Sequence, residues 1–284
     1  MKRLALVAVF AVGCGAITAQ AQTLALGYHT GDTYNYSFHS TTTQTITAGS
    51  ISLPADVEMS ANEAVKVVSV DSAGTADLAL TLSNFTIKST AAGVSNTTTG
   101  LPGATNDLKV AADGRILSLD GNQIAGGNPF LALSGMGGGF FVTAVLPSNA
   151  VKPGDTWSKD YDQANPGGTG SVHLTTHSTY LRNETFNGVN AAVVETTSTG
   201  SIDITLGTAN AAATTAAFGG SITGTMTSDV TTWFDPIAHR VLKTHSTSTN
   251  NGTMTFSGAS MTVLPGLSGP ITIKGAGTTD LTSA

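Results

Sequence analysis

The sequence predicts an all-β protein, mainly an antiparallel meander, with little helix beyond an N-terminal signal peptide. No stretch repeats apolar residues at the three-to-four-residue spacing of an amphipathic helix over three turns. β-Branched Thr, Val and Ile are dense, whereas the helix-favouring Glu, Lys, Arg and Gln are scarce. Short alternating segments are separated by turn-forming residues. We expect either one curved sheet, shaped like a half-barrel, or two packed sheets.

The first 21 residues have the three parts of a secretory signal peptide. Lys2 and Arg3 precede an uncharged apolar run over 4–17, and small residues lead to Ala19-Gln20-Ala21. We expect cleavage between Ala21 and Gln22. The apolar run is shorter than the roughly 20 residues that a membrane-spanning helix needs, and no later segment is longer. The mature protein is therefore expected in the periplasm or outside the cell, and not as an integral membrane protein.

The single cysteine, Cys14, leaves a second processing route open. The stretch 10–14 resembles a lipobox, the motif in which a cysteine is lipidated after cleavage in front of it. In that case the protein would be a lipoprotein anchored through Cys14. On either route the folded part holds no disulfide, so burial and the hydrogen-bond ladder must stabilise it.

The charge balance excludes two classes of partner. Twelve basic and 18 acidic residues are present, and removal of the two basic residues of the signal peptide gives 10 − 18 = −8. A mildly acidic chain lacks the basic face that nucleic acid or anionic lipid headgroups require. Charged residues make up 11% of the chain, and Thr, Ser, Gly and Ala take their place. This bias suits strands whose outer faces carry hydroxyl groups, and it equally fits a low-complexity surface.

Four hairpins are predicted from strand pairs separated by turn chemistry. The predicted arms are 65–70 with 76–82, 108–110 with 115–119, 179–186 with 189–197, and 241–249 with 253–256. Asn187-Gly188 and Asn251-Gly252 provide the two tightest predicted turns, because Asn-Gly favours the positive φ angles of a primed turn.

The two parts of the chain also resemble each other. Gly31-Asp32-Thr33-Tyr34 recurs as Gly154-Asp155-Thr156-Trp157, and the segment 109–117 is similar to 234–242. An internal duplication of about 120 residues explains both echoes, although short matches also arise by chance. We expect a first β half over 22–125, a connector over 126–150 and a second β half over 151–284.

The connector is apolar, rich in glycine and, over 128–142, uncharged. Exposed apolar patches mark interaction sites, so this segment is either a lid over an apolar cavity or a connection packed into the core. For the lid, the residues expected to line or cover the ligand are Phe130, Leu131, Phe140 and Phe141, with Trp157 and Trp233 as walls.

No motif for catalysis, metal or cofactor binding is present. The sequence lacks the Gly-x-Ser-x-Gly, phosphate-loop and His-Glu-x-x-His patterns, and we predict no catalytic residues, no metal and no cofactor. His173 and His177 lie four residues apart in a predicted strand, about 13 Å, too far to share one ion. Asp155, Asp160 and Asp162 could hold calcium, but a charged strand end explains them as well.

Glutamate pairs are the remaining route to an enzyme. Glycoside hydrolysis needs two carboxyl groups, and a hydrolase stays open as a third hypothesis. No motif links any two of the glutamates, which are Glu58, Glu63, Glu184 and Glu195.

The sequence resembles exported bacterial β-rich proteins of uncharacterised families. The resemblance rests on the stretch Val-Lys-Pro-Gly-Asp-Thr-Trp at 151–157, the signal peptide and the meander. The organisation is also similar to the curved half-barrel of LolA/LppX-like lipoprotein and lipid carriers. That resemblance implies an apolar cavity between sheet and connector. The family's lid helices have no counterpart here, and no functional residue can be carried over.

These observations lead to a non-enzymatic exported envelope protein that binds a lipid or another apolar ligand in a concave β-sheet. The alternative is a structural or adhesive envelope module, without an enclosed ligand, whose hydroxyl-rich faces contact other envelope components. The two differ in whether the inner face of the sheet binds an apolar molecule.

Overall fold

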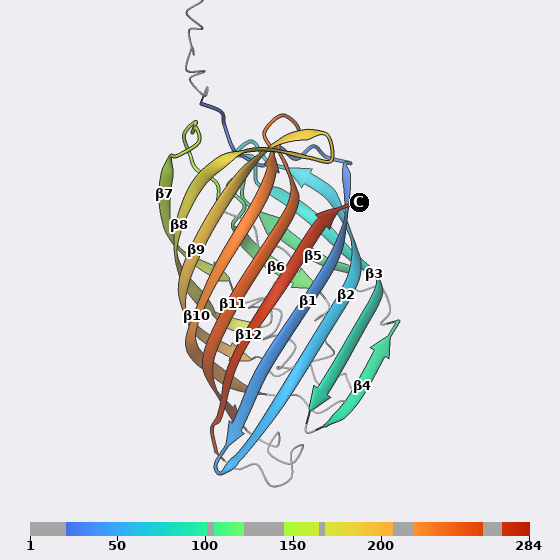
Figure 1. Cartoon of the computed structure of the whole chain (residues 1–284), viewed down its shortest axis with the longest axis vertical. Helices are drawn as coiled ribbons and strands as arrows, with labels where there is room; N and C mark the ends of the chain where they lie inside the picture. The colour runs from blue at the N-terminus through green and yellow to red at the C-terminus, as the bar shows by residue number, and fades with distance from the viewer. Residues whose placement is uncertain are drawn as a thin grey trace, which may run out of the picture.

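The computed structural model describes residues 21–91, 93–100, 105–121, 145–164, 168–206, 219–257 and 269–284, and these form one twelve-stranded antiparallel sheet (Figure 1). Within these ranges there is no helix, hence none long and apolar enough to span a bilayer. The signal peptide with Cys14, and most of the connector, lie outside the described residues. The strands are β1 (Thr33–Ala48), β2 (Ile51–Val70), β3 (Ala76–Ala91), β4 (Val94–Thr99), β5 (Thr105–Val110), β6 (Ile116–Gly121), β7 (Thr156–Ala164), β8 (Gly168–Phe186), β9 (Val189–Leu206), β10 (Gly219–Asp235), β11 (Arg240–Ser257) and β12 (Ile271–Ser283).

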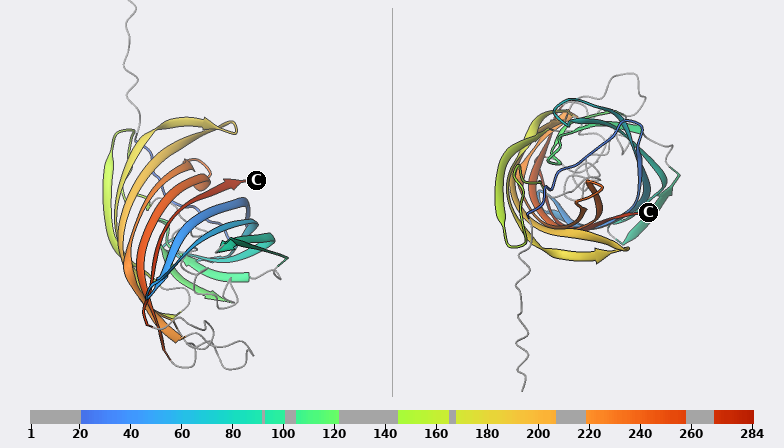
Figure 2. Two further views of the ribbon diagram at one scale, coloured as in Figure 1. Left: turned by 60° about the horizontal axis from the view of Figure 1, so that its bottom comes forward. Right: turned by 90° about the horizontal axis from the view of Figure 1, so that it is seen from above.

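The strands follow the order β6-β5-β3-β2-β1-β12-β11-β10-β9-β8-β7, and β4 pairs with β3. The sheet curls so far that it encircles an interior when viewed from above (Figure 2, right). It is not closed, because β6 and β7 are its two edges and share no ladder among the described residues. All-β class, antiparallel meander and single curved sheet are thus confirmed, and the alternative of two packed sheets is wrong.

Each long strand alternates between an exposed outer face and a buried inner face. On β1, Phe38 and Ser40 are buried while His39 and Thr41 are exposed. This alternation follows from the two-residue period of a strand whose one face is covered. Most strands are far longer than the five or six residues typical of globular proteins, and β2 has 20. The curl therefore encloses a tall inner face.

The two parts of the chain occupy the two sides of this sheet. The strands β1 to β6 form one side and β7 to β12 the other, and pairing of β1 with β12 joins them. Both pairs of similar segments occupy equivalent places in the two parts. The Gly-Asp-Thr turns precede β1 and β7, and the segments 109–117 and 234–242 span the β5–β6 and β10–β11 turns. Register shifts occur in both of these hairpins, at Lys109/Val110 and at Trp233/Phe234. This correspondence is what an internal duplication predicts.

Three of the predicted hairpins are confirmed, and the fourth is wrong. Instead of turning at Asn251-Gly252, the chain continues through it as the single strand β11. β11 pairs with β10 on one side and β12 on the other over this stretch, and Gly252 lies opposite Gly224. A ladder on both sides satisfies the backbone groups that a turn would leave unpaired, so tertiary pairing overrides the local turn preference.

A segment at the start of the described chain, residues 22–27, crosses the upper end of the sheet. We call it the capping segment. Gln22 exchanges two backbone hydrogen bonds with Val151, and the N–H of Leu26 donates to the carbonyl of Ala112 at 2.8 Å. The N–H of Gly27 donates to the carbonyl of His239 at 2.9 Å. Because Ala112 and His239 belong to turns from opposite sides of the sheet, the capping segment ties the two sides together.

Candidate functional site

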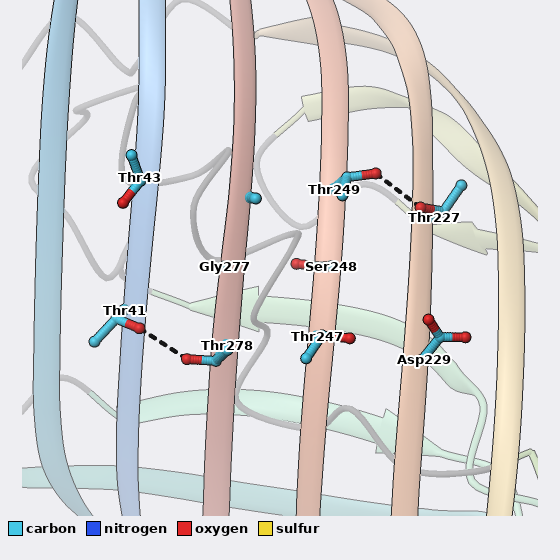
Figure 3. Close-up of a pocket in the computed structure, with 10 residues that line it drawn as sticks. Thr41, Thr43, Thr227, Asp229, Thr247, Ser248, Thr249, Gly277 and Thr278 are labelled. Carbon is cyan, nitrogen blue, oxygen red and sulfur yellow. Dashed lines mark hydrogen bonds between the residues drawn. The ribbon is translucent and has the colours of Figure 1, made fainter.

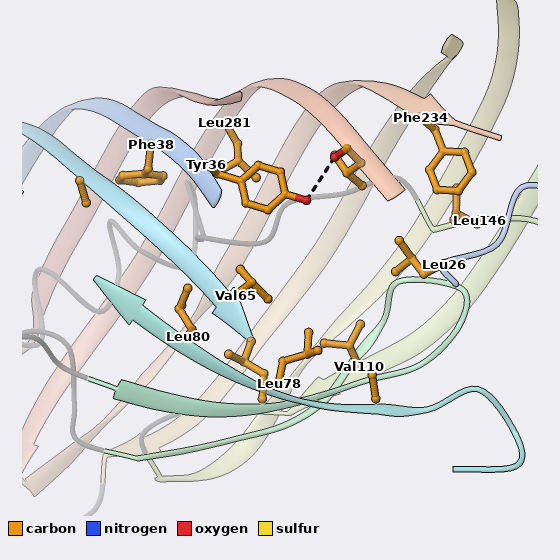
Figure 4. Close-up of a cluster of buried hydrophobic side chains, with 14 of the residues drawn as sticks. Leu26, Tyr36, Phe38, Val65, Leu78, Leu80, Val110, Leu146, Phe234 and Leu281 are labelled. Carbon is orange, nitrogen blue, oxygen red and sulfur yellow. Dashed lines mark hydrogen bonds between the residues drawn. The ribbon is translucent and has the colours of Figure 1, made fainter. Parts of the chain in front are cut away.

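The inner face of the sheet has three zones. An upper apolar cluster lies under the capping segment and includes aromatic side chains (Figure 4). A lower apolar cluster lies toward the opposite end of the long strands. The upper cluster contains Leu24, Leu26, Tyr36, Phe38, Val65, Leu78, Leu80, Leu146, Tyr180, Phe234 and Leu281 among others. The lower cluster contains Ala48, Val172, Ile202, Ile222, Met254, Ile271 and Ile273.

Between the clusters, much of the inner face carries buried hydroxyl groups, which we call the hydroxyl belt. It comprises Ser40, Thr42, Thr176, Ser178, Thr196, Thr232, Thr244, Ser246, Ser248 and Thr279. Hydrogen bonds link some members across strands, including Ser178 with Thr196 at 2.8 Å and Thr279 with Ser40 at 3.1 Å. The belt contains no charge, and hydroxyl groups both donate and accept. Its chemistry therefore suits neutral polar groups.

Glu63 is the exception on the inner face of β2. Its side chain is buried, with 1% exposed, and every other buried residue of this strand is apolar. Among the described residues, neither carboxylate oxygen has a hydrogen-bond partner. Burial raises the pKa of Glu63 from 4.5 to about 8, with no other cause contributing. A carboxyl group placed in apolar surroundings without a partner is costly, so the fold retains it at the expense of stability.

Tyr36 lies beside Glu63, on β1, and Tyr28 and Arg240 interact electrostatically with Tyr36. The Tyr36 hydroxyl donates to the carbonyl of Val241 at 3.1 Å (Figure 4). Burial raises the pKa of Tyr36. The Arg240 guanidinium lowers this pKa, and Glu63 raises it. The Nε of Arg240 is buried and has no partner in the described part of the chain. Burial likewise raises the pKa of Tyr28, and the nearby Tyr36 raises it further.

The open seam between β6 and β7 is bridged by side chains rather than by a ladder. Asp113, in the β5–β6 turn, pairs with Arg115 at 2.9 Å and lies 3.9 Å from Lys159 of β7. The Arg115 guanidinium also lies over the ring of Tyr161 on β7, 5.8 Å from its centroid. The Tyr161 pKa is raised to about 12, mainly by burial. One backbone hydrogen bond also joins the two sides here, from the Leu146 N–H to the carbonyl of Asp113 at 2.8 Å. These few contacts open more easily than a strand ladder, which has many backbone bonds.

The two predicted wall tryptophans occupy different environments. Trp157 packs partly buried against the upper cluster, and its indole N–H donates to the carbonyl of Val145 at 2.6 Å. Trp233 is partly exposed, donates to Glu184 at 3.2 Å and lies under the Lys243 ammonium, which is 4.8 Å from its ring centroid. The wall role of both stays a prediction.

The four predicted lining residues of the connector lie outside the described residues, so their role also stays a prediction. They are Phe130, Leu131, Phe140 and Phe141.

The acidic residues that suggested calcium point to other partners. Asp160 and Asp162 both pair with His173, at 2.9 and 3.1 Å. Asp155 accepts a hydrogen bond from the Lys152 N–H at 2.9 Å, within its turn. No group of three metal-ligating side chains converges among the described residues. His177 contacts Ser158 at 2.8 Å instead of His173.

A shallow hollow of about 390 Å³ lies on the outer face, across β1, β12, β11 and β10 (Figure 3). Threonine hydroxyls line it, including the hydrogen-bonded pairs Thr41–Thr278 at 2.7 Å and Thr227–Thr249 at 2.8 Å. Among the described residues of its lining, Asp229 is the one carboxylate. The hollow is polar and faces solvent, so it cannot shelter an apolar ligand.

Sequence reasoning counted Glu63 among the glutamates but missed its position. The sequence does carry a signal for this position. Glu63 lies at an even spacing from the apolar residues of the same strand, so it shares their face; these residues are Val57, Met59, Val65 and Val67. A carboxylate in phase with an apolar stripe points inward, where charges are rarely placed without a partner.

No known protein-family model matches the sequence, and no curated protein is significantly similar to it. Among solved structures, a similar one is titled "Lipid-protein interactions in lipovitellin", with 10% identity and a TM-score of 0.47. The match covers 90% of this chain and 25% of that one, so this chain spans about a quarter of lipovitellin's length. Likeness at this level supports no argument about the ligand of this chain. The resemblance to LolA/LppX-like carriers stays a prediction.

Proposed function

We propose that this is a non-enzymatic exported protein of the bacterial envelope that holds a lipid-like ligand against the inner face of its curved sheet. The observation that carries the proposal is the zoning of that face into two apolar clusters and an uncharged hydroxyl belt. The apolar clusters suit hydrocarbon, and the belt suits ester, hydroxyl or amide groups along the ligand.

The energetics favour such a ligand without any catalytic apparatus. Each methylene moved from water to an apolar surface contributes about 0.8 kcal/mol. A chain of about ten methylenes therefore offers on the order of 8 kcal/mol before the entropic cost of binding is subtracted. The hydroxyl belt prevents the inner face from being uniformly apolar, which favours amphiphiles over plain hydrocarbon.

Entry through the seam between β6 and β7 requires no strand ladder to break. These strands are the sheet edges, and the contacts around Asp113 are the bridge between them. Opening them breaks one backbone hydrogen bond, from Leu146 to Asp113, and separates charged side chains that are already partly exposed to water. This costs less than breaking a strand ladder.

The test is native mass spectrometry of the mature chain, residues 22–284, purified from the periplasm and then extracted with organic solvent. We expect an added mass that moves into the solvent as lipid. A bare protein at its calculated mass, with no uptake of added lipid either, would overturn the proposal.

A matched pair of variants on β11 localises the ligand. Ser246 belongs to the hydroxyl belt and is buried, whereas the next residue, Thr247, is exposed on the outer face. Ser246→Met should fill space on the inner face and lower the amount of bound lipid, while Thr247→Met should leave it unchanged. Thermal unfolding of both variants checks that each still folds. Equal lipid content in the two variants would place the ligand elsewhere.

The outer hollow favours a second candidate, a structural or adhesive module that contacts hydroxyl-rich envelope polymers. Threonine hydroxyls and Asp229 offer hydrogen bonds to such a surface. Ala276, the small side chain in the lining of β12, can be replaced by Gln to fill the hollow. Retention of the protein on isolated cell-wall material should then fall, with lipid content unaffected. Unchanged retention would remove this candidate.

A further inference from the structure

We infer that Glu63 is the polar contact for the ligand's head group, and that this head group is a protonated amine on an otherwise apolar molecule. The inference rests on the proposed function and names the class of ligand. The Glu63 carboxyl group lies on an otherwise apolar inner stripe of β2, and its oxygens have no donor within the described ranges.

Among the described residues, no hydrogen bond gives Glu63 a donor. Its strand neighbours across the ladder are Tyr36 on β1 and Leu82 on β3. The Tyr36 hydroxyl is already engaged with the carbonyl of Val241. Arg240 influences the pKa of Tyr36 and Tyr34 but is not among the causes that shift Glu63. A ligand that reaches this carboxyl group can supply the donor that the described neighbours do not.

A local irregularity of the β2–β3 ladder lies close to this residue. The β2–β3 register shifts between Ser60 and Asn62, and on the facing strand Asn84 adopts a positive φ of 52°. Bulges of this kind are enriched next to functional sites, where they redirect side chains. Here the irregularity accompanies the burial of Phe85, which adds an aromatic surface to the same cluster.

An amine satisfies the site better than the other common head groups. An ammonium carries three donors and a positive charge, and its attraction to a carboxylate is strong where water is excluded. An alcohol can satisfy one oxygen without charge compensation. A fatty acid would place a second acidic group beside Glu63, which is unfavourable unless one of them stays protonated. For chains of equal length we expect the order amine, then alcohol, then acid.

Amine binding should release a proton from Glu63, and this makes the affinity depend on pH in the unmutated protein. Without ligand, Glu63 is mostly protonated at neutral pH, because burial raises its pKa to about 8. Binding an ammonium ionises Glu63 and expels its proton. Affinity for the amine should therefore rise by up to about tenfold per pH unit below pH ~8 and then level off, until the amine itself titrates near pH ~10. Among the described residues, the ionisable groups linked to this region are Tyr28, Tyr34, Tyr36 and Arg240, with the buried Asp235 opposite Arg240 in the ladder.

The experiment compares dodecylamine, dodecanol and dodecanoic acid as competitors of a fluorescent apolar dye bound to the mature chain. The variants are Glu63→Gln and, as the matched control on the same strand, Glu58→Gln. Glu58 is about half exposed, on the outer face. We expect the wild type to bind dodecylamine about tenfold or more tightly than dodecanol. Glu63→Gln should reduce this preference to within about twofold, and Glu58→Gln should preserve it.

The outcomes separate the inference from the proposed function. If amine and alcohol bind equally well, or if the amine preference survives Glu63→Gln, the inference is overturned while lipid-like binding stands. If none of the three compounds displaces the dye, the proposed function fails and the inference fails with it. If Glu63→Gln does not fold, the pH series of the wild type decides: flat dodecylamine affinity between pH ~6 and ~8 contradicts the inference.

Discussion

Gly31 and Gly154 make the same backbone hydrogen bond in the two halves of the chain. The Gly31 N–H donates to the carbonyl of Val67 at 2.9 Å, and the Gly154 N–H donates to the carbonyl of Tyr180 at 2.7 Å. Their φ angles are 97° and 95°. Val67 and Tyr180 each border a register shift of their hairpin, the first toward β3 and the second toward β9. Such agreement in turn, partner and bulge supports an internal duplication over chance similarity of short motifs.

Gly31→Ala and Gly154→Ala should each destabilise the protein by about 1–2 kcal/mol, because an L side chain is strained at these φ angles. Nothing lies within 4 Å of a Cβ added at either position, so backbone strain is the sole cause. Urea unfolding measures the loss. Losses of similar size confirm that the turns are equivalent, and a neutral result at either one contradicts it.

Gly224 and Gly252 lie opposite each other on β10 and β11 but should tolerate a methyl group differently. A Cβ at Gly224 would lie 2.4 Å from the carbonyl oxygen of Asn251, whereas one at Gly252 would meet its closest atom at 3.4 Å. Gly224→Ala should therefore cost about 1–3 kcal/mol by overpacking, and Gly252→Ala should be near neutral. Thermal unfolding of the two variants provides the comparison. The reverse ranking would mean that the β10–β11 register is wrong.

The capping segment should contribute measurably through Leu24, which is completely buried in the upper cluster. Leu24→Ala is expected to lower the free energy of unfolding by about 2–4 kcal/mol, through lost burial and the cavity left behind. The neighbouring Thr23 is exposed, so Thr23→Ala serves as the control and should have little effect. Equal stability of the two variants would show that the capping segment is not anchored.

The buried Glu63 should make the protein less stable as the pH rises. Its folded-state pKa of about 8 lies above the unfolded value of 4.5, so the native state holds the proton more tightly. The free energy of unfolding should fall between pH ~4.5 and ~8, by on the order of 5 kcal/mol at most. Glu63→Gln should flatten this pH profile, and Glu58→Gln should not. Denaturant titrations at several pH values measure this free energy. A wild type whose stability does not change over this pH range would contradict the prediction.

The fold class could be predicted from sequence because alternation and turn chemistry are local. The hairpin at Asn187-Gly188 formed as expected, with φ of 47° and 82° at its two turn residues. The same dipeptide at Asn251-Gly252 did not turn, because strands on both sides of β11 pair with it there. Pairing between distant strands decides such cases, and single-sequence patterns do not contain it.

The candidate site was less predictable than the fold. The apolar interior was expected, whereas the hydroxyl belt was not, because Ser and Thr occur on both faces of the strands. Ser246 and Thr247 illustrate this: the first is buried and the second exposed, yet their residue types are nearly equivalent. Only the phase of a strand relative to its neighbours assigns such residues to a face.

The pairing of β1 with β12 also sets the order in which the molecule can be assembled. Tyr36 obtains its ladder partner, Ser283, only after nearly all of the chain has emerged. Each half can zip from its own consecutive hairpins, but the join between them has a very large sequence separation and must therefore form late and slowly. On the export route proposed above, this late join would keep the two halves unlocked until the chain has crossed the membrane.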